Sequence, residues 1–249
     1  MFTLVGYETS ASNAALTAIT PIPDGTVAVI SNDIRVPAAL PNILNVAAMI
    51  NSAVATLRVQ IVTPSLRAVV PFDVSPIANG LVFGSLPRAD HLWFTPIPLI
   101  GLEPMDAFVQ NGAAVMNRVF VWLGDGPVKP TTGKIYTLRA TATATLVTAS
   151  WVNSGALTFA STLPTGHYQI VGGRSWSANQ CAWRVFIPGY AWRPGMPALN
   201  AEDNNEWFYA RYGQLGVWGE FDNTVPPTID FMGITDTAEV VYLDLIKVS

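Results

Sequence analysis

Two stretches of this chain resemble each other, and this internal sequence repeat, called here the echo, constrains the fold more than any other feature. Residues 55–71 read ATLRVQIVTPSLRAVVP, and residues 181–197 read CAWRVFIPGYAWRPGMP. The echo predicts two copies of one structural unit within the chain. The identical aligned positions are Arg58/Arg184, Val59/Val185, Ile61/Ile187, Arg67/Arg193 and Pro71/Pro197.

Shorter matches extend the echo in the same order from one end of the chain to the other. A duplication over the whole length explains this order, with a first copy at 1–125, a Gly- and Pro-rich linker at 126–134 and a second copy at 135–249. The matches are FTL at 2–4 with YTL at 136–138, AALTAI at 14–19 with ATLVTA at 144–149, TVAVIS at 26–31 with ALTFAS at 156–161, LP at 40–41 with LP at 163–164, and NRVFVWL at 117–123 with LDLIKVS at 243–249.

The duplication also decides between helix and strand where one copy alone is ambiguous. Residues 39–57, ALPNILNVAAMINSAVATL, are rich in alanine and could form a helix. Their counterpart at 167–183, HYQIVGGRSWSANQCAW, has two central glycines between β-formers, a pattern that indicates strand, turn and strand. We therefore predict strands over 43–50 and 55–62. With turn signals such as PDG at 23–25, each copy offers about eight strand candidates, which predicts one β-sandwich per copy.

The composition favours a protein that works in an assembly. Half of the residues are hydrophobic and only 12% are charged, about half the usual share. Extended uncharged apolar surface normally marks places where another molecule binds. The formal net charge is −4 and lysine is scarce, so we expect no direct binding of nucleic acid.

Residues suited to catalysis are sparse. The two histidines, His91 and His167, have no nearby cysteine and no HExxH spacing, so we expect no catalytic residue, no metal and no cofactor. Cys181, the single cysteine, lies in an apolar run and is expected to be a buried hydrophobic residue. The first ten residues lack the positive and apolar regions of a signal peptide, so synthesis in a cytosol is expected.

Two acidic clusters leave alternatives open. Glu202, Asp203 and Glu206 could ligate Ca²⁺, but their order does not match a calcium loop, and a solvated loop is favoured. Glu220 and Asp222 are two residues apart, so both carboxylates would point from one face of a strand. Paired carboxylates beside tryptophan occur in glycosidases. The alternative function is therefore a secreted tandem β-sandwich that binds or acts on carbohydrate.

Tryptophan and arginine concentrate at subunit interfaces, and this chain has eight tryptophans. Arg67 and Arg193 occupy equivalent positions in the echo, and Trp192 stands beside Arg193. We predict that Arg67, Arg193, Trp192 and Trp218 contribute to contacts between subunits.

A tandem of two eight-stranded sandwiches, weakly charged and without catalytic motifs, resembles the double jelly-roll major capsid proteins of the PRD1–adenovirus lineage, near the compact versions from bacteriophages. The resemblance covers the whole chain and implies an all-β double jelly roll. It also implies a non-enzymatic homotrimer whose six upright jelly rolls form a pseudo-hexameric tile of an icosahedral shell. The implied partners are further copies, other capsid proteins such as a vertex protein, and an internal membrane. The implied location is the virion, after synthesis in the host cytoplasm.

Overall fold

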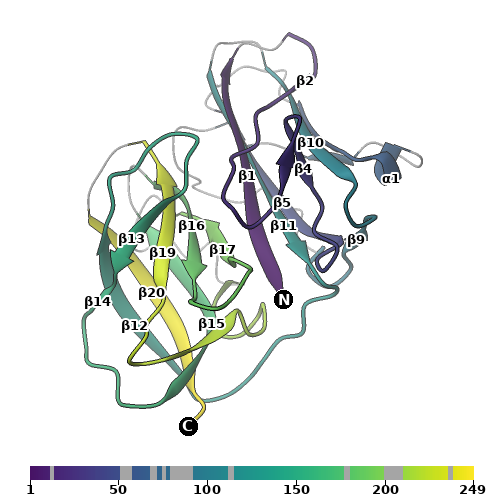
Figure 1. Ribbon diagram of the computed structural model, residues 1–249. Helices are drawn as coiled ribbons and strands as arrows, with labels where there is room; N and C mark the ends of the chain where they lie inside the picture. The colour runs from purple at the N-terminus through teal and green to yellow at the C-terminus, as the bar shows by residue number, and fades with distance from the viewer. Residues whose placement is uncertain are drawn as a thin grey trace. The chain divides into compact units, whose positions relative to one another are not determined.

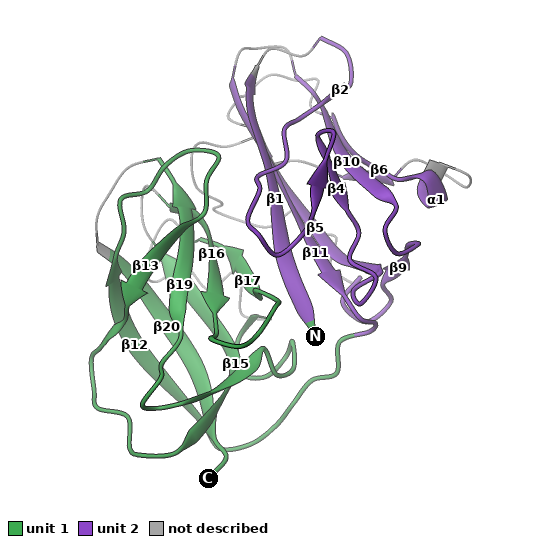
Figure 2. Cartoon of the chain, viewed as in Figure 1, with its two compact units in different colours: residues 1, 128–249 green, residues 2–127 purple. Residues whose placement is uncertain are grey.

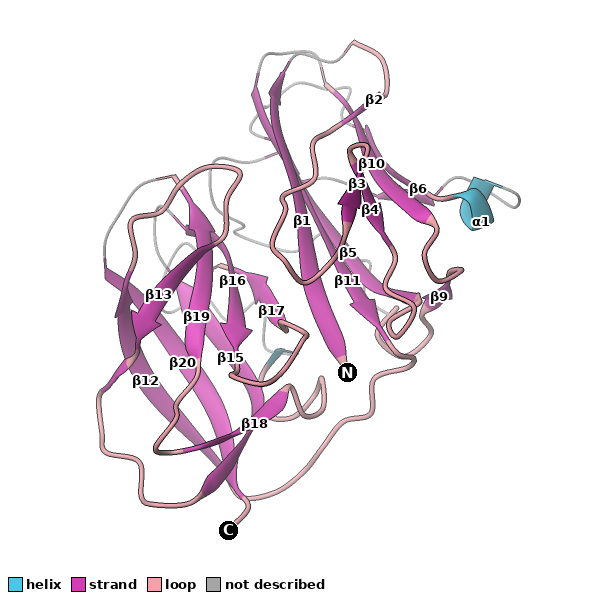
Figure 3. Cartoon of the chain, viewed as in Figure 1, coloured by secondary structure: helices cyan, strands magenta, loops and turns pink. Residues whose placement is uncertain are grey.

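In the computed structural model, the regular elements of the described residues are strands, apart from one short helix (Figures 1 and 3). The chain divides into two compact units, unit 1 with Met1 and residues 128–249, and unit 2 with residues 2–127 (Figure 2). The predicted linker at 126–134 spans this division. The structure describes residues 1–11, 14–50, 58–67, 72–74, 77–78, 92–111, 115–176, 180–198, 210–234 and 238–249.

Unit 2 consists of two sheets. The first has the order β1-β11-β5-β8, with β9 also paired to β5. The second has the order β3-β4-β10-β6-β7, with β2 also paired to β10. The elements are β1 (Phe2–Ala11), β2 (Thr17–Ala18), β3 (Val29–Ile30), β4 (Asp33–Arg35), β5 (Asn42–Ile50), β6 (Arg58–Val62), α1 (Pro64–Arg67), β7 (Phe72–Val74), β8 (Ile77–Ala78), β9 (Ile97–Pro98), β10 (Pro104–Gln110) and β11 (Val115–Gly124).

Unit 1 also consists of two sheets, with the orders β14-β12-β20-β15-β18 and β13-β19-β16-β17. The elements are β12 (Ile135–Thr143), β13 (Val152–Ala156), β14 (Thr158–Phe159), β15 (His167–Trp176), β16 (Gln180–Phe186), β17 (Gly195–Pro197), β18 (Gly219–Asp222), β19 (Thr228–Gly233) and β20 (Ala238–Lys247).

The two units repeat one strand order. In each unit, the last strand lies between the first long strand and the second long strand of the chain. The resulting orders are β1-β11-β5 in unit 2 and β12-β20-β15 in unit 1. In the second sheets, β10-β6-β7 corresponds to β19-β16-β17. Two mostly antiparallel sheets with these strand orders, in which neighbours in a sheet are mostly distant along the chain, form a jelly roll. The predicted all-β double jelly roll is therefore confirmed.

Most of the residues that align between the two similar stretches lie in corresponding elements of the two units. Arg58 lies in β6 and Arg184 in the corresponding β16. Arg67 ends α1 between β6 and β7, and Arg193 lies in the corresponding connection between β16 and β17. The matched residues thus occupy equivalent strands and loops in the two units.

Two proposed matches are wrong. Residues 14–19 contain β2, which pairs with β10, whereas the matched residues 144–149 contain no strand. The stretches 26–31 and 156–161 contain β3 and β14, but β3 pairs with β4 in the second sheet of unit 2, whereas β14 pairs with β12 in the first sheet of unit 1. The reason is the longer loop SNDIRVPAA at 31–39, which forms β4 and draws β3 into a hairpin. Unit 1 has no such loop and leaves β14 to cover the edge of β12.

The Ala-rich segment forms the strand β5, as the duplication predicts, while residues 51–57, which include the connection between the two predicted strands, lie outside the described residues. The glycine pair of its counterpart does not form the expected turn, because Gly172 and Gly173 lie inside β15. A Cβ at Gly172 would lie 2.5 Å from the carbonyl oxygen of Ala210. Gly172 is thus required by a segment that crosses the strand, and Gly173 by the Trp183 ring, which would lie 2.7 Å from its Cβ. Neither glycine makes a reversal of the chain.

Aromatic side chains fill much of each core. In unit 2, Trp93 packs edge-on against Trp122 with ring centroids 5.5 Å apart, and against Phe2 at 5.8 Å. In unit 1, Trp183 and Trp218 lie 5.7 Å apart. Such pairs add about 0.5–1.5 kcal/mol beyond the burial of their surface.

Candidate interface site

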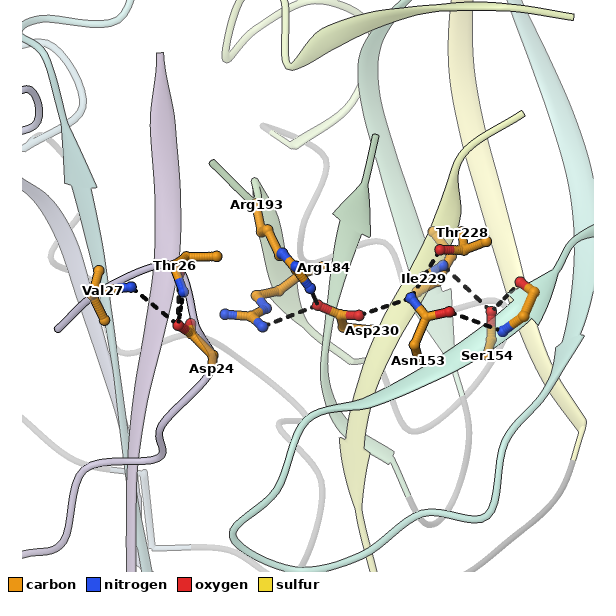
Figure 4. A network of polar contacts seen from close by, with 11 residues as sticks. Asp24, Thr26, Val27, Asn153, Ser154, Arg184, Arg193, Thr228, Ile229 and Asp230 are labelled. Carbon is orange, nitrogen blue, oxygen red and sulfur yellow. Dashed lines mark hydrogen bonds and ion pairs between the residues drawn. The ribbon is translucent and has the colours of Figure 1, made fainter. Parts of the chain in front are cut away.

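A polar cluster that includes the predicted interface residue Arg193 is centred on Asp230 in β19 (Figure 4). Asp230 stands opposite Arg184 of β16 on one side and Asn153 of β13 on the other, because β19 is the strand between them. Cross-strand register alone therefore brings the three side chains together. The carboxylate accepts hydrogen bonds from Nη2 of Arg184 at 3.0 Å and from Nδ2 of Asn153 at 3.0 Å.

Arg193 reaches the same carboxylate from the loop before β17, with 2.5 Å between its Nη1 and Oδ2 of Asp230. The next residues of this loop run close to β16, because Gly195 pairs with Arg184. A Cβ at Gly195 would lie 2.1 Å from the carbonyl oxygen of Trp183, so only glycine fits there. The Gly195 backbone thus lets the loop carry Arg193 over the sheet.

Aromatic rings complete the cluster. The guanidinium carbon of Arg184 lies 3.8 Å from the centre of the Trp151 ring, and that of Arg193 lies 4.3 Å from the centre of the Phe186 ring. Cation–π contacts of this kind are strongest where water is excluded. The side chain of Arg184 is fully buried and that of Asp230 is 3% exposed, whereas that of Arg193 is 21% exposed. Two guanidinium groups therefore share one carboxylate, and only Arg193 extends to the surface.

The four predicted interface residues have different surroundings. Trp192 is half-buried beside Arg193. Trp218 is only 4% exposed and belongs to the core of unit 1, which does not suit a surface contact. Arg67 ends α1, and its side chain lies outside the described part of the structure. An interface role for Arg67, Trp192 and Arg193 stays a prediction.

Glu220 and Asp222 do share one face, as their spacing predicts. Both line a shallow hollow of about 210 Å³ in unit 1, together with His167, Ile187, Pro188, Phe221 and Val225. Glu220 accepts a hydrogen bond from Gln169, and Asp222 lies 3.4 Å from Nε2 of His167. The hydroxyl and backbone amide of Thr224 hold the pKa of Asp222 below its usual value. The Asp222 carboxylate, which is ionised at neutral pH in any case, therefore stays charged to a lower pH than an ordinary aspartate.

Other polar residues of the sequence have simpler surroundings. Among the residues that the structure describes, no group of three or more His, Cys, Asp or Glu is arranged to hold a metal ion. His91 and the cluster Glu202, Asp203 and Glu206 lie outside those residues. Cys181 is fully buried in β16, as expected for a small hydrophobic residue. No helix of the described structure is long and apolar enough to cross a membrane.

The sequence did not reveal two further buried ion pairs. Arg211 donates to Asp244 from Nε at 2.6 Å and from Nη2 at 2.8 Å, and this fastens the 210–216 segment over β15 and β20. In unit 2, the buried Arg118 of β11 pairs with Glu8 of β1 directly opposite. Glu8, Arg118 and Asp244 are polar residues within mostly apolar strands, and this is a weak signal of the pairs in the sequence, whereas Arg211 lies outside the strands.

Comparisons with known proteins give little sequence similarity. No known family profile matches the chain, and no curated protein sequence is similar to it. Among solved structures, the major capsid protein P2 from bacteriophage PM2 is similar over 100% of this chain and 98% of that protein, with 12% sequence identity and a TM-score of 0.22.

Proposed function

We propose that this protein is a viral major capsid protein, a structural subunit that forms homotrimers. The observation that carries the proposal is the repetition of one jelly-roll strand order in both units of a single chain. Three such chains contain six similar units, which can surround one axis as a pseudo-hexameric tile. Tiles of this shape can cover the faces of an icosahedral shell. Fold alone does not determine function, so the assembly must be measured.

The scarcity of surface charge supports an assembled state. Only 12% of the residues are charged, and several large hydrophobic side chains, including Ile100, Leu102 and Val225, are more than half exposed. Neighbouring copies in a closed shell would cover much of this surface. The proposed partners are thus other copies of the chain, a vertex protein and an internal membrane, and the proposed location is the virion. The role needs no catalytic residue and no cofactor.

Native mass spectrometry and electron microscopy of the purified protein test the proposal. We expect a trimer at micromolar concentration that resists high salt and dissociates in denaturant, because obligate interfaces of this kind commonly bury more than about 2,000 Å² of mostly apolar surface. Shell-like particles or sheets of tiles would support the capsid role. A stable monomer, or a closed oligomer with an even number of copies, would refute it.

The hollow lined by Glu220 and Asp222 favours a second candidate, a carbohydrate-binding protein. Carboxylates accept hydrogen bonds from sugar hydroxyls, and the hollow also has apolar walls. The candidate predicts a monomer that is retained on immobilised sugar. Glu220→Gln and Asp222→Asn should then abolish retention while the chain stays folded. A trimer that no sugar retains contradicts it.

A further inference from the structure

The linker between the two units is held by another part of unit 1. The backbone amide of Thr131 donates a hydrogen bond to the carbonyl of Gly213 at 2.8 Å. A Cβ at Gly216 would lie 2.7 Å from the carbonyl oxygen of Lys129, so the two backbones are in close contact there as well. This part of the linker therefore lies against residues 210–216, called here the clamp.

The clamp is itself fastened to the first sheet of unit 1. The amide of Gly213 donates to the carbonyl of Val171 in β15 at 2.7 Å, and the amide of Tyr212 donates to a carboxylate oxygen of Asp244 in β20 at 3.0 Å. The guanidinium group of Arg211 pairs with the same carboxylate, which is fully buried. The clamp thus joins the linker to two neighbouring strands.

The backbone of the clamp has an enforced conformation. Tyr212, Gly213 and Gly216 have left-handed φ values of +54°, +78° and +72°. The left-handed region is unfavourable for a tyrosine, and such a conformation persists only where surrounding contacts impose it. The hydrogen bonds to Asp244 and Val171 supply this restraint. A segment fixed in one conformation can hold the linker in one path.

Only a short span of chain separates the held linker from unit 2. Gly124 ends β11 and pairs with Phe2 and Asn42, so it is fixed in unit 2. Unit 1 resumes at Val128. At Gly126, φ is +155° and a Cβ would meet no atom within 4 Å, so this residue combines a permissive backbone with open surroundings.

We propose that the clamp makes linker residues 128–134 a fixed part of unit 1 and confines the freedom between the two units to residues 125–127. The inference goes beyond the capsid role and holds for a monomer or an oligomer. Without the clamp, the flexible span would extend over residues 125–134. The reach of a flexible span grows as the square root of its length, so it would increase by roughly 1.8-fold. Clamped units have less freedom to lose when a partner binds both, which favours association.

Gly216→Ala tests the clamp, and Gly155→Ala is its matched control. Both glycines belong to unit 1 and have nearly the same φ, +72° and +71°, but a Cβ at Gly155 would meet no atom within 4 Å. The two variants therefore share one conformational cost, and only Gly216→Ala pushes the Lys129 carbonyl away. Thr131→Pro also releases the linker, because proline lacks the N–H group that bonds to Gly213. Gly216→Ala and Thr131→Pro are called here the linker variants.

Amide hydrogen exchange measures the hold on the linker. We expect the amide of Thr131 to exchange at least about 10-fold faster in Gly216→Ala than in Gly155→Ala or the unsubstituted chain, because its hydrogen bond to Gly213 is lost. Equal exchange rates in the three chains would overturn the proposal.

Distances between spin labels on the two units measure the freedom between them. Thr17→Cys in unit 2 and Val147→Cys in unit 1 are exposed attachment points, whereas the native Cys181 is buried. Labelled chains are diluted with unlabelled chains, so that each measured distance lies within one chain. We expect the distance distribution to widen by roughly 1.5-fold or more in both linker variants and to stay unchanged in the control. Linker variants with a distribution as narrow as that of the control would overturn the proposal.

Discussion

Asp230→Asn should destabilise unit 1 strongly, because it removes the one carboxylate that two guanidinium groups share. Asn keeps the shape of Asp230, so the change is mainly one of charge. Arg184 has no exposure to water and the side chain of Asp230 is 3% exposed, so solvent cannot replace the lost partner. Removing one member of a buried ion pair costs about 3–5 kcal/mol. Since a domain is typically stable by about 5–15 kcal/mol, the variant should lose a large part of its stability.

Urea unfolding followed by tryptophan fluorescence and circular dichroism measures this loss. With a slope of about 2 kcal/mol per molar urea, the midpoint should fall by about 1.5–2.5 M. Asp73→Asn is the matched control, since Asp73 of β7 also pairs with an arginine across a sheet, Arg58 at 3.0 Å. Those side chains are 53% and 45% exposed, and exposed pairs contribute about 0–1 kcal/mol. A shift for Asp230→Asn no larger than that of the control would refute the reasoning.

Two further predictions concern backbone conformation and titration. Gly213→Ala should destabilise the protein by several times more than Gly25→Ala in thermal unfolding. Both residues have a left-handed φ, of +78° at Gly213 and +75° at Gly25. A Cβ at Gly213 would lie 2.2 Å from the carbonyl oxygen of Thr131, whereas a Cβ at Gly25 would meet no atom within 4 Å. Equal losses of stability in the two variants would contradict this account. The hydrogen bond from Arg58 lowers the pKa of Asp73, so this interaction stabilises the fold at pH above the unfolded pKa and is lost as pH falls through the lower folded pKa. NMR titration of Arg58→Ala should show the pKa of Asp73 returning toward its usual value, and an unchanged pKa would show that another group is responsible.

The assignment of strands could be predicted from sequence because the duplication offered two versions of each element. The Ala-rich β5 illustrates this, since its own composition suits a helix and its counterpart, β15, decides for a strand. The same comparison was wrong about the glycine pair, because Gly172 and Gly173 lie inside β15 and not in a turn. Gly172 permits the close approach of Ala210, and a contact 38 residues away in the sequence leaves no local pattern.

The site was harder to predict because matched residues do not share an environment. Arg58 and Arg184 align in the echo and lie in corresponding strands, yet Arg58 is exposed and pairs with Asp73, whereas Arg184 is buried and pairs with Asp230. The partners come from different neighbouring strands, β7 in one unit and β19 in the other. Duplication therefore preserves topology, while the burial of each side chain depends on what covers that face of the sheet.

Burial of charge makes the surface less charged than the composition indicates. Of 13 basic and 17 acidic residues, at least three arginines and five acidic residues are buried, and most of them belong to the pairs centred on Glu8, Asp230 and Asp244. Buried pairs add little net stability compared with apolar residues of similar volume, but they penalise any packing that separates them. A strand that slipped by one residue would move Arg184 away from Asp230 and leave both charges unpaired. The charges of this chain thus favour one register within each unit, and the surface is left with few charges to oppose association between copies.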